Sequence, residues 1–412
     1  MPLRNVIDLD ANATTAIDPR VLEAMRPHLL IGGNPESRHS LGRAARNAWD
    51  ESRESIAAIL GAHVDELVLT SGGTESNNMA IFGLIDESTR LRSSPEERSR
   101  PSVVLVSGIE HPAVAEPLVL LEKQGRLRRE IGPVRPDGTI DTERWLERIA
   151  DDKPLDLVTL MLANNETGAI QDVSAIARAI AARHIVMHTD AVQAVGRMDV
   201  DFSALGVTTL AAGSHKMHGP PGIGILLIRK GQKIAPIFHG GGQQLGLRPG
   251  TPAVALAVGL AEALRLWQAE KTARTLQWRT LGTVLIESLR QKLADIPVNV
   301  IENGPADPDR RLPQTLNLFF DHPAIEGELL LMRLDLAGLA ASLGSACASG
   351  STKASPALSA MGMDTHRAKS SIRLSFSAFT TPDHVTRAVD IIASIVQDLT
   401  STSTEAWPDF GH

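Results

Sequence analysis

The stretch IVMHTDAVQAVGRMDVDFSALGVTTLAAGSHK, residues 185–216, contains two short apolar runs that each end in polar residues. The first run, Ile185 to His188, leads into the cluster TDAVQ, and the second, Thr208 to Ala211, leads into GSHK. Short β-branched runs bounded by polar or glycine clusters are typical of buried strands in a parallel sheet. We therefore expect this stretch to supply two strands of an α/β sheet.

The same pattern extends on both sides of this stretch, from about residue 65 to residue 230. Helical stretches separate further expected strands at Leu67 to Thr70, Val103 to Ser107, Leu157 to Leu162 and Gly224 to Ile228. Five clusters follow strand ends, namely SGGTESNN, GIEHP, ANNETG, TDAVQ and GSHK. Because ligands bind at the carboxyl ends of strands in open α/β sheets, we expect these clusters to converge on one pocket.

The carboxyl-terminal part of the chain indicates a second, smaller α/β layer. A long alanine- and leucine-rich helical pattern runs from about residue 253 to 295, and PVNVIEN, QTLNLFF and SIRLSFS then resemble strands. We predict a large domain over residues 16–262 and a small domain formed by residues 1–15 plus 263–412. Residues 86–102 are polar and charged, which indicates an exposed excursion between a helix and a strand.

Length and composition exclude several classes of protein. The 412 residues, 43% hydrophobic and 22% charged, are typical of a globular protein with two domains. The formal net charge of -7 argues against nucleic acid as the main partner, because phosphate backbones are bound by clustered Lys and Arg. The chain has no signal-peptide stretch and no run of about 18 apolar residues, so we expect a cytoplasmic protein without a membrane segment. The single cysteine, Cys347, excludes an intrachain disulfide and a cysteine-rich zinc site.

Lys216 and Asp190 together indicate a site for pyridoxal phosphate (PLP). Lys216 lies in the small-residue turn GSHKMHGPPG, 26 residues after Asp190. A loop lysine is by default a solvated charge, but PLP chemistry needs both groups, a lysine to form a Schiff base with the cofactor and an aspartate to keep the pyridine nitrogen protonated. Gln193 would suit a hydrogen bond to the ring hydroxyl if a helical turn begins at Asp190.

Two further segments fit such a site. In SGGTESNN, two glycines including Gly73 let the backbone approach an anion, and Thr74 opens a helix whose first amides suit a phosphate. A glycine pair before a helix is more often a plain turn, so this signal depends on Lys216 and Asp190. His111 follows a strand end, where an imidazole could stack on the pyridine ring and move protons, although a lone histidine is more often structural.

These motifs resemble those of the class V, fold type I PLP enzymes, and among them the cysteine desulfurases of the NifS and IscS type. The resemblance covers nearly the whole chain, from LDANATTAIDPRV near the amino terminus to SSIRLSFSAFTT. Between these lie GNPESRHSLGR, LTSGGTESNN, HPAV, MLANNETGAIQD, HTDAVQAVG, SHKMHGPPGIG, HGGGQQLGLRPGT and LGSACASG. The resemblance implies an α/β, fold type I PLP-dependent transferase with a mainly parallel sheet in the large domain and the catalytic cysteine loop in a smaller α/β domain.

The resemblance also implies a role for each matching residue. The cofactor would be held by Lys216, with Asp190 on the ring nitrogen, Gln193 on the hydroxyl and His111 stacked on the ring. Its phosphate would be bound by Gly73, Thr74, Ser214, His215 and, from the other subunit of a homodimer, Thr251. The carboxylate of L-cysteine would be held by Asn34, Asn165 and Arg373, the last because a guanidinium pairs bidentately with a carboxylate.

Cys347 would be the nucleophile. A lone cysteine is more often a buried structural residue, but LGSACASG is too rich in Gly and Ser for a packed strand. In the family this cysteine attacks, as a thiolate, the sulfur of PLP-bound cysteine, which leaves a persulfide on the enzyme and releases alanine. The loop GSTKASPAL that follows is similar to the IscS-like group and could deliver sulfur to an acceptor such as an iron-sulfur scaffold protein.

Some positions depart from the family pattern, and other functions stay open. Gly213 stands where a serine is common, with Ser214 one position later, and Pro249 removes a backbone donor from the RPGT segment. The rival functions are a selenocysteine lyase or another class V lyase or aminotransferase, and a non-catalytic desulfurase-like interaction protein. A zinc site at His215 and His218 lacks a carboxylate at ligand spacing, so we expect no metal. The absence of tyrosine excludes aminotransferases of the aspartate type.

Overall fold

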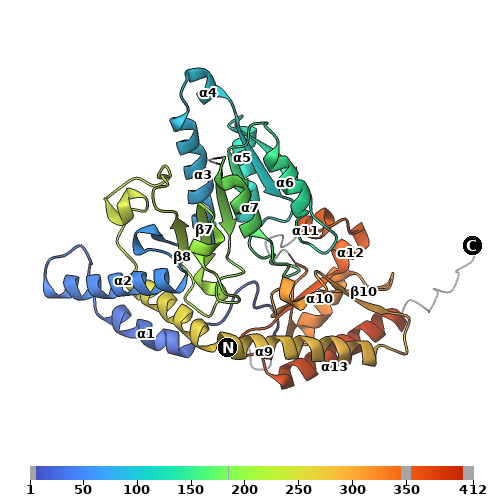
Figure 1. Ribbon diagram of the computed structural model, residues 1–412. Helices are drawn as coiled ribbons and strands as arrows, with labels where there is room; N and C mark the ends of the chain where they lie inside the picture. Colours follow the sequence, from blue (N-terminus) through green and yellow to red (C-terminus); the bar gives the residue numbers. More distant parts are fainter. Residues whose placement is uncertain (1–5, 184, 345–353, 402–412) are drawn as a thin grey trace, which may run out of the picture.

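A seven-stranded sheet forms the centre of the computed structural model, which describes residues 6–183, 185–344 and 354–401 (Figure 1). The strand order is β2-β8-β7-β6-β5-β3-β4. The strands are β2 (Leu67–Thr70), β3 (Ser102–Ser107), β4 (Leu127–Gly132), β5 (Leu157–Thr159), β6 (Val186–Asp190), β7 (Thr209–Gly213) and β8 (Gly224–Ile228). Strand β8, between β2 and β7, runs opposite to the other six strands, which are parallel to one another. The mainly parallel sheet confirms the expected α/β class.

The sequence predicts most of these strands, because parallel strands covered by helices are apolar on both faces and form continuous apolar runs. Every residue of β2, β3, β5, β7 and β8 is buried. β4 differs, because only the first and last residues of its sequence LRREIG, Leu127 and Gly132, are buried. β4 is an edge strand, and an edge strand can remain partly exposed to solvent. It therefore has no continuous apolar run from which it could be predicted.

Helices cover both faces of this sheet (Figure 1). Alternate residues of one strand point to opposite faces, so Val68 packs in one core with helices α3 and α5, and Leu67 and Leu69 pack in the other. The helices around the sheet are α1 (Pro19–Leu30), α2 (Ser40–Ile59), α3 (Gly73–Leu91), α5 (Pro112–Lys123), α6 (Thr142–Ala150), α7 (Val173–Ala181) and the short α8 (Phe202–Leu205).

A second core lies around a three-stranded antiparallel sheet of order β12-β10-β9. The elements of this carboxyl-terminal part are β9 (Asn299–Asn303), β10 (Thr315–Asp321), α10 (Gly327–Leu336), α11 (Pro356–Ala360), α12 (Thr365–Ser370), β12 (Ile372–Ser375) and α13 (Pro382–Ser401). The amino-terminal strand β1 (Ile7–Asp8) joins this part, where it pairs in parallel with β11 (Leu339–Ala340). Both Ile7 and Leu9 pack in its core.

Helix α9 (Val254–Lys292) connects the two cores along the base of the molecule (Figure 1). Its first half contributes Leu260 and Leu264 to the core of the large sheet, and its second half contributes Trp278 and Leu285 to the core of the small sheet. The predicted domain boundary after residue 262 thus falls inside one continuous helix.

The polar excursion at residues 86–102 contains more helix than its composition suggests. Helix α3 continues to Leu91, and a short helix α4 (Pro95–Ser99) follows, capped by the side chain of Ser94. None of the residues of α4 is buried, which agrees with the expected exposure. Across the part of the chain that the structure describes, no helix combines the length and apolar character needed to span a membrane.

Candidate active site

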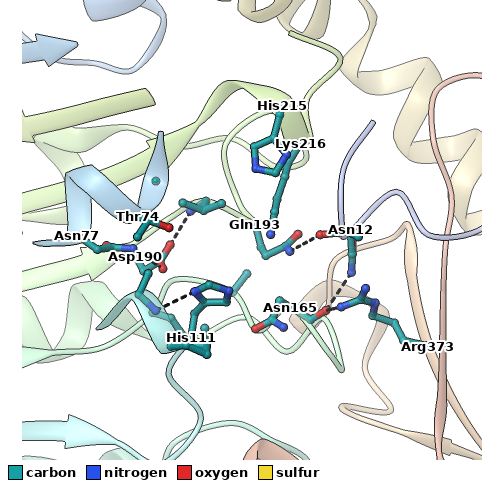
Figure 2. Close-up of a pocket in the computed structure, with 17 residues that line it drawn as sticks. Asn12, Thr74, Asn77, His111, Asn165, Asp190, Gln193, His215, Lys216 and Arg373 are labelled. Atoms are coloured by element: carbon teal, nitrogen blue, oxygen red, sulfur yellow. Dashed lines mark hydrogen bonds between the residues drawn. The ribbon is translucent and has the colours of Figure 1, made fainter. Parts of the chain in front are cut away.

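The polar clusters converge at the carboxyl-terminal edge of the large sheet, on a cavity of about 250 Å³ (Figure 2). Strands β2, β3, β6 and β7 all end at this edge, because each is parallel to the others. The polar and glycine residues that line the cavity are Asn12, Gly73, Thr74, Asn77, His111, Asn165, Asp190, Gln193, His215, Lys216 and Arg373. Nine of the residues selected from the sequence therefore lie together.

Lys216 enters the cavity from the end of β7. It ends a single 3-10 turn, Ser214–Lys216, that follows the strand directly. Figure 2 shows its side chain directed between Asp190 on one side and Asn165 and Arg373 on the other. The neighbouring His215 has a pKa lowered to about 4, chiefly by burial and then by the charge of Lys216, so its ring is neutral at physiological pH.

Asp190 is held by a chain of buried hydrogen bonds. Its Oδ1 accepts from the backbone N of Val192 at 2.9 Å, and its Oδ2 accepts from Nδ2 of Asn77 at 2.8 Å. The Oδ1 of Asn77 must then accept from Nε2 of His188 (2.8 Å), whose Nδ1 accepts from Oγ1 of Thr209 (2.9 Å). Burial lowers the pKa of His188 to about 4, which keeps the ring neutral in this tautomer.

The amino terminus of α3 offers an anion-binding end. Its N-cap, Gly72, has no side chain, so the first amides of the helix lack a side-chain cap. A Cβ at Gly73 would lie 2.5 Å from Cγ2 of Val192, and only glycine lets the helix begin this close to the end of β6. Thr74 follows in the first turn and lines the cavity. Free amides at a long helix's positive end suit a phosphate.

His111 is the N-cap of α5 and is oriented by the turn that it caps. Its Nδ1 accepts from the backbone N of Ala113 at 3.1 Å, so the neutral ring carries its proton on Nε2 (Figure 2). Burial lowers the pKa of His111, Asp190 opposes this shift, and Lys216 adds to it. A neutral imidazole with an Nε2–H group therefore lines the cavity.

Glu110, the residue before His111, has a buried carboxyl group that forms hydrogen bonds with the neighbouring strand ends. Its Oε1 accepts from Oγ of Ser107 at 2.6 Å and from the backbone N of Met161 at 2.9 Å. Burial raises the pKa of Glu110 to about 7. Its Oε2 is buried and has no hydrogen-bond partner among the described residues. The cluster GIEHP thus carries a second titratable group that its sequence did not single out.

Arg373 forms the opposite wall of the cavity, from the middle of β12. Its side chain is only 2% exposed, although a strand arginine is by default a surface charge. Nη2 donates to Oδ1 of Asp10 at 2.6 Å, and Nη1 donates to the carbonyl oxygens of Asn165 (3.0 Å) and Gly344 (2.7 Å). Its Nε is buried and has no acceptor among the described residues, so this N–H can donate to a ligand.

Three residues selected from the sequence do not line the cavity, and a fourth is not among the described residues. Ser214 is fully buried, and its Oγ points toward Gly219 rather than the cavity, since a Cβ at Gly219 would lie 2.1 Å from it. Asn34 and Thr251 are exposed and do not line the cavity. Cys347 lies outside the described residues. The roles of these four residues stay predictions.

Several residues of the site were not anticipated. Asn77 had a usable signal, because it follows Thr74 by three residues and so lies on the same side of the helix. His188 had one too, since it precedes Asp190 by two residues on one strand. Asn12 and Arg197 carry no local signal, because they meet only through a hydrogen bond between residues 185 positions apart in the sequence.

The chain is similar to known proteins over most of its length. The chain matches the family model described as aminotransferase class-V over residues 7–388. It is 37% identical over 402 residues to a protein of Dictyoglomus turgidum named cysteine desulfurase IscS, an alignment that covers 97% of each chain.

Solved structures show the same similarity. A NifS-like protein superposes with a TM-score of 0.83 at 32% identity, covering 95% of this chain and 99% of the other. A structure described as SspA in complex with cysteine superposes with a TM-score of 0.75 at 29% identity, covering 90% of this chain and 99% of the other.

Proposed function

Since this chain belongs to the aminotransferase class-V family, we propose that it acts as a cysteine desulfurase. It is a PLP-dependent enzyme of fold type I that converts L-cysteine to L-alanine and transfers the sulfur to an enzyme cysteine and on to acceptors. The observation that carries this proposal is the meeting of Lys216 and Asp190 in one cavity that also contains Arg373. An amine, a carboxylate and a guanidinium in this arrangement suit a cofactor on one side and an amino acid on the other.

The residues of the cavity fit the cofactor. An uncapped helix start at Gly72 and Gly73 suits its phosphate, and the doubly hydrogen-bonded Asp190 suits its pyridine nitrogen. Lys216 would supply the amine that holds its aldehyde. When bound, PLP withdraws electrons from the substrate's carbon atoms and so weakens the bond that is to be broken.

Each side chain then has a defined task. Asp190, fixed by Asn77, would hold the ring nitrogen, and Gln193 would donate to the ring hydroxyl. His111 would stack on the ring and could pass a proton to or from Lys216 or the substrate through its Nε2–H group. Thr74 and His215 would bind the phosphate.

Arg373 binds the substrate's carboxylate. Two observations support this role: its Nε has no acceptor among the described residues, and its Nη2 forms an ion pair with Asp10. An incoming carboxylate can replace Asp10 on the guanidinium and form a bidentate pair. Asn165 supports the same group from the loop after β5. Asn34 would join them from the exposed segment before α2.

Cys347 carries out the sulfur transfer. Its thiolate attacks the sulfur of the bound cysteine, so that an S–S bond forms and the substrate's Cβ–S bond breaks. The electron pair of the broken bond stays with the substrate carbon, which takes up a proton and leaves as alanine. The persulfide then passes to an acceptor, for which an iron-sulfur scaffold protein is our first candidate.

We also propose a cytoplasmic homodimer in which Thr251 of one subunit completes the phosphate site of the other. The exposure of Thr251, away from its own cavity, supports this arrangement. Measuring molar mass in solution tests the dimer, and a Thr251→Ala variant should weaken PLP binding only if the residue reaches a phosphate.

The function itself is tested with purified protein, PLP, L-cysteine and a thiol reductant. Sulfide and alanine should appear in equal amounts. Cys347→Ser should abolish sulfide release and leave the visible absorbance of bound PLP unchanged. A wild-type protein that binds PLP and releases no sulfide contradicts the proposal, and a strong preference for selenocysteine over cysteine would favour a selenocysteine lyase.

A further inference from the structure

Arg197 is a buried cation with an unusual set of partners. The residue is 3% exposed, and its guanidinium donates to the carbonyls of Ala11 (2.7 Å) and Lys216 (3.0 Å), to Oδ1 of Asn12 (2.8 Å) and to Oε1 of Gln193. All four acceptors are neutral. Burial, followed by the repulsion of Arg373, lowers the pKa of Arg197 to about 9, so the group remains charged at neutral pH.

Comparable arginines in the described part of the chain are neutralised by an acid. Two others are as deeply buried, Arg274 and Arg373, and they pair with Glu270 and Asp10 at 2.6 Å. A buried charge that lacks such a partner is costly. The cost indicates that Arg197 is retained for what it does to its neighbours, Gln193 and Lys216.

The partners of Gln193 determine which way its amide faces. Arg197 can only donate, so it must face the Gln193 oxygen, and the carbonyl of Asn12 can only accept, so it must face the nitrogen, at 3.0 Å. Gln193 lines the cavity. With its oxygen turned toward Arg197 and one N–H bound to Asn12, the amide has its second N–H donor available for the cavity.

We propose that Arg197 is a positioning residue for the cofactor: it fixes Gln193 with its N–H donor toward the ring hydroxyl and anchors the backbone of Lys216. This inference rests on the proposed function. A hydrogen bond donated to the ring oxygen weakens the hydrogen bond between that oxygen and the protonated nitrogen of Lys216. The bound cofactor therefore loses this proton at a lower pH when Arg197 is present.

Other charged groups also affect the pH at which the Lys216 nitrogen loses its proton, so the test must leave these groups unchanged. Those that face the cavity are Lys216 itself, Asp190, His111, His215 and Arg373. Arg197 does not line the cavity and contacts it through three lining residues, namely Gln193, Asn12 and the backbone of Lys216. Its effect can be separated from theirs by a double-mutant cycle with Gln193.

The test is a pH titration of the visible absorbance of the PLP-loaded protein. Arg197→Met should raise the midpoint by about one pH unit, the equivalent of one lost hydrogen bond. In a Gln193→Ala background the same substitution should move the midpoint by less than half as much. If the methionine variant does not fold, Arg197→Lys serves instead, because a single ammonium group cannot satisfy four acceptors, and its midpoint should also rise.

Arg274→Met is the matched control, since it removes an equally buried arginine outside the cavity and should leave the midpoint unchanged. An unchanged midpoint in the Arg197 variants overturns the inference, and so does an equal shift in both backgrounds. A wild-type protein that acquires no visible absorbance with PLP would instead refute the proposed function.

Discussion

The two walls of the cavity are built in different ways. The wall we assign to the cofactor consists of residues from the strand ends of one sheet, with Asp190 and His188 on β6 and Asn77 on the helix beside it. The wall we assign to the substrate carboxylate joins Arg373 to Asp10 and Asn165, which are 363 and 208 residues away in the sequence.

The walls also differ in how completely their polar groups are paired. Both oxygens of Asp190 accept N–H donors, and the chain behind it continues to a buried histidine. Arg373, in contrast, has a buried Nε without an acceptor among the described residues and an ion pair with the part-exposed Asp10. The first wall is therefore suited to a cofactor that stays bound, and the second to a substrate carboxylate that binds and dissociates in each reaction cycle.

Lys216→Ala should have the largest effect, because it removes the amine that we propose joins the cofactor to the first wall. We expect sulfide release to fall by at least about a thousandfold. Borohydride reduction of the PLP-loaded wild type, followed by peptide mapping, should label Lys216. The exposed Lys230 provides the control variant, and labelling elsewhere would contradict the assignment.

Arg373→Gln should damage the second wall alone. Losing a charge-assisted hydrogen bond of about 1.5–3 kcal/mol should raise the KM for cysteine by roughly ten- to a hundredfold, with PLP absorbance unchanged. Arg311→Gln removes an arginine paired with Glu302 outside the cavity and should leave KM unaltered. A variant with normal KM and weakened PLP binding would show that the two walls are not separate.

His188 makes the stability of the first wall depend on pH. Its folded-state pKa, about 4, is below the value of about 6.5 in an unfolded chain. As the pH falls, the unfolded state therefore binds the proton first. The contribution of His188 to the free energy of unfolding is complete above pH 6.5 and declines as the pH falls toward 4.

Urea unfolding at pH 7 and pH 5 measures this contribution. Between these values the wild type should lose about 2 kcal/mol more unfolding free energy than His188→Gln. The exposed His366 gives the control, whose replacement by Gln should keep the wild-type dependence. An identical pH dependence in wild type and His188→Gln would show that His188 is not buried as a neutral ring.

Asn77→Ala should have the smallest effect of the four. It removes one donor from Asp190 and leaves the other, so we expect the PLP dissociation constant to rise by about tenfold, as one hydrogen bond of about 1.4 kcal/mol requires. Asn78→Ala, one residue further along α3, should not change it. Equal losses in both variants would point to damage to the helix rather than to Asp190.

The first wall could be predicted from the sequence to a large degree. Lys216, Asp190 and His111 each follow an apolar run, and parallel strands bring their carboxyl ends to one edge. Strand β4 escaped prediction because an edge strand needs no continuous apolar run. The direction of the Ser214 side chain also could not be predicted, since a one-residue step in a tight turn decides between the cavity and Gly219.

By itself, the sequence determined the α/β class, the strand-end clusters and the residue types of the site, because hydrophobic periodicity and turn chemistry are local. Only the tertiary structure decided the burial of Arg373, its pairing with Asp10, and the contact of Arg197 with Gln193 and Lys216. Long polar side chains take their partners from whatever segment passes within hydrogen-bond distance, and here those segments include the amino-terminal residues, far away in the chain.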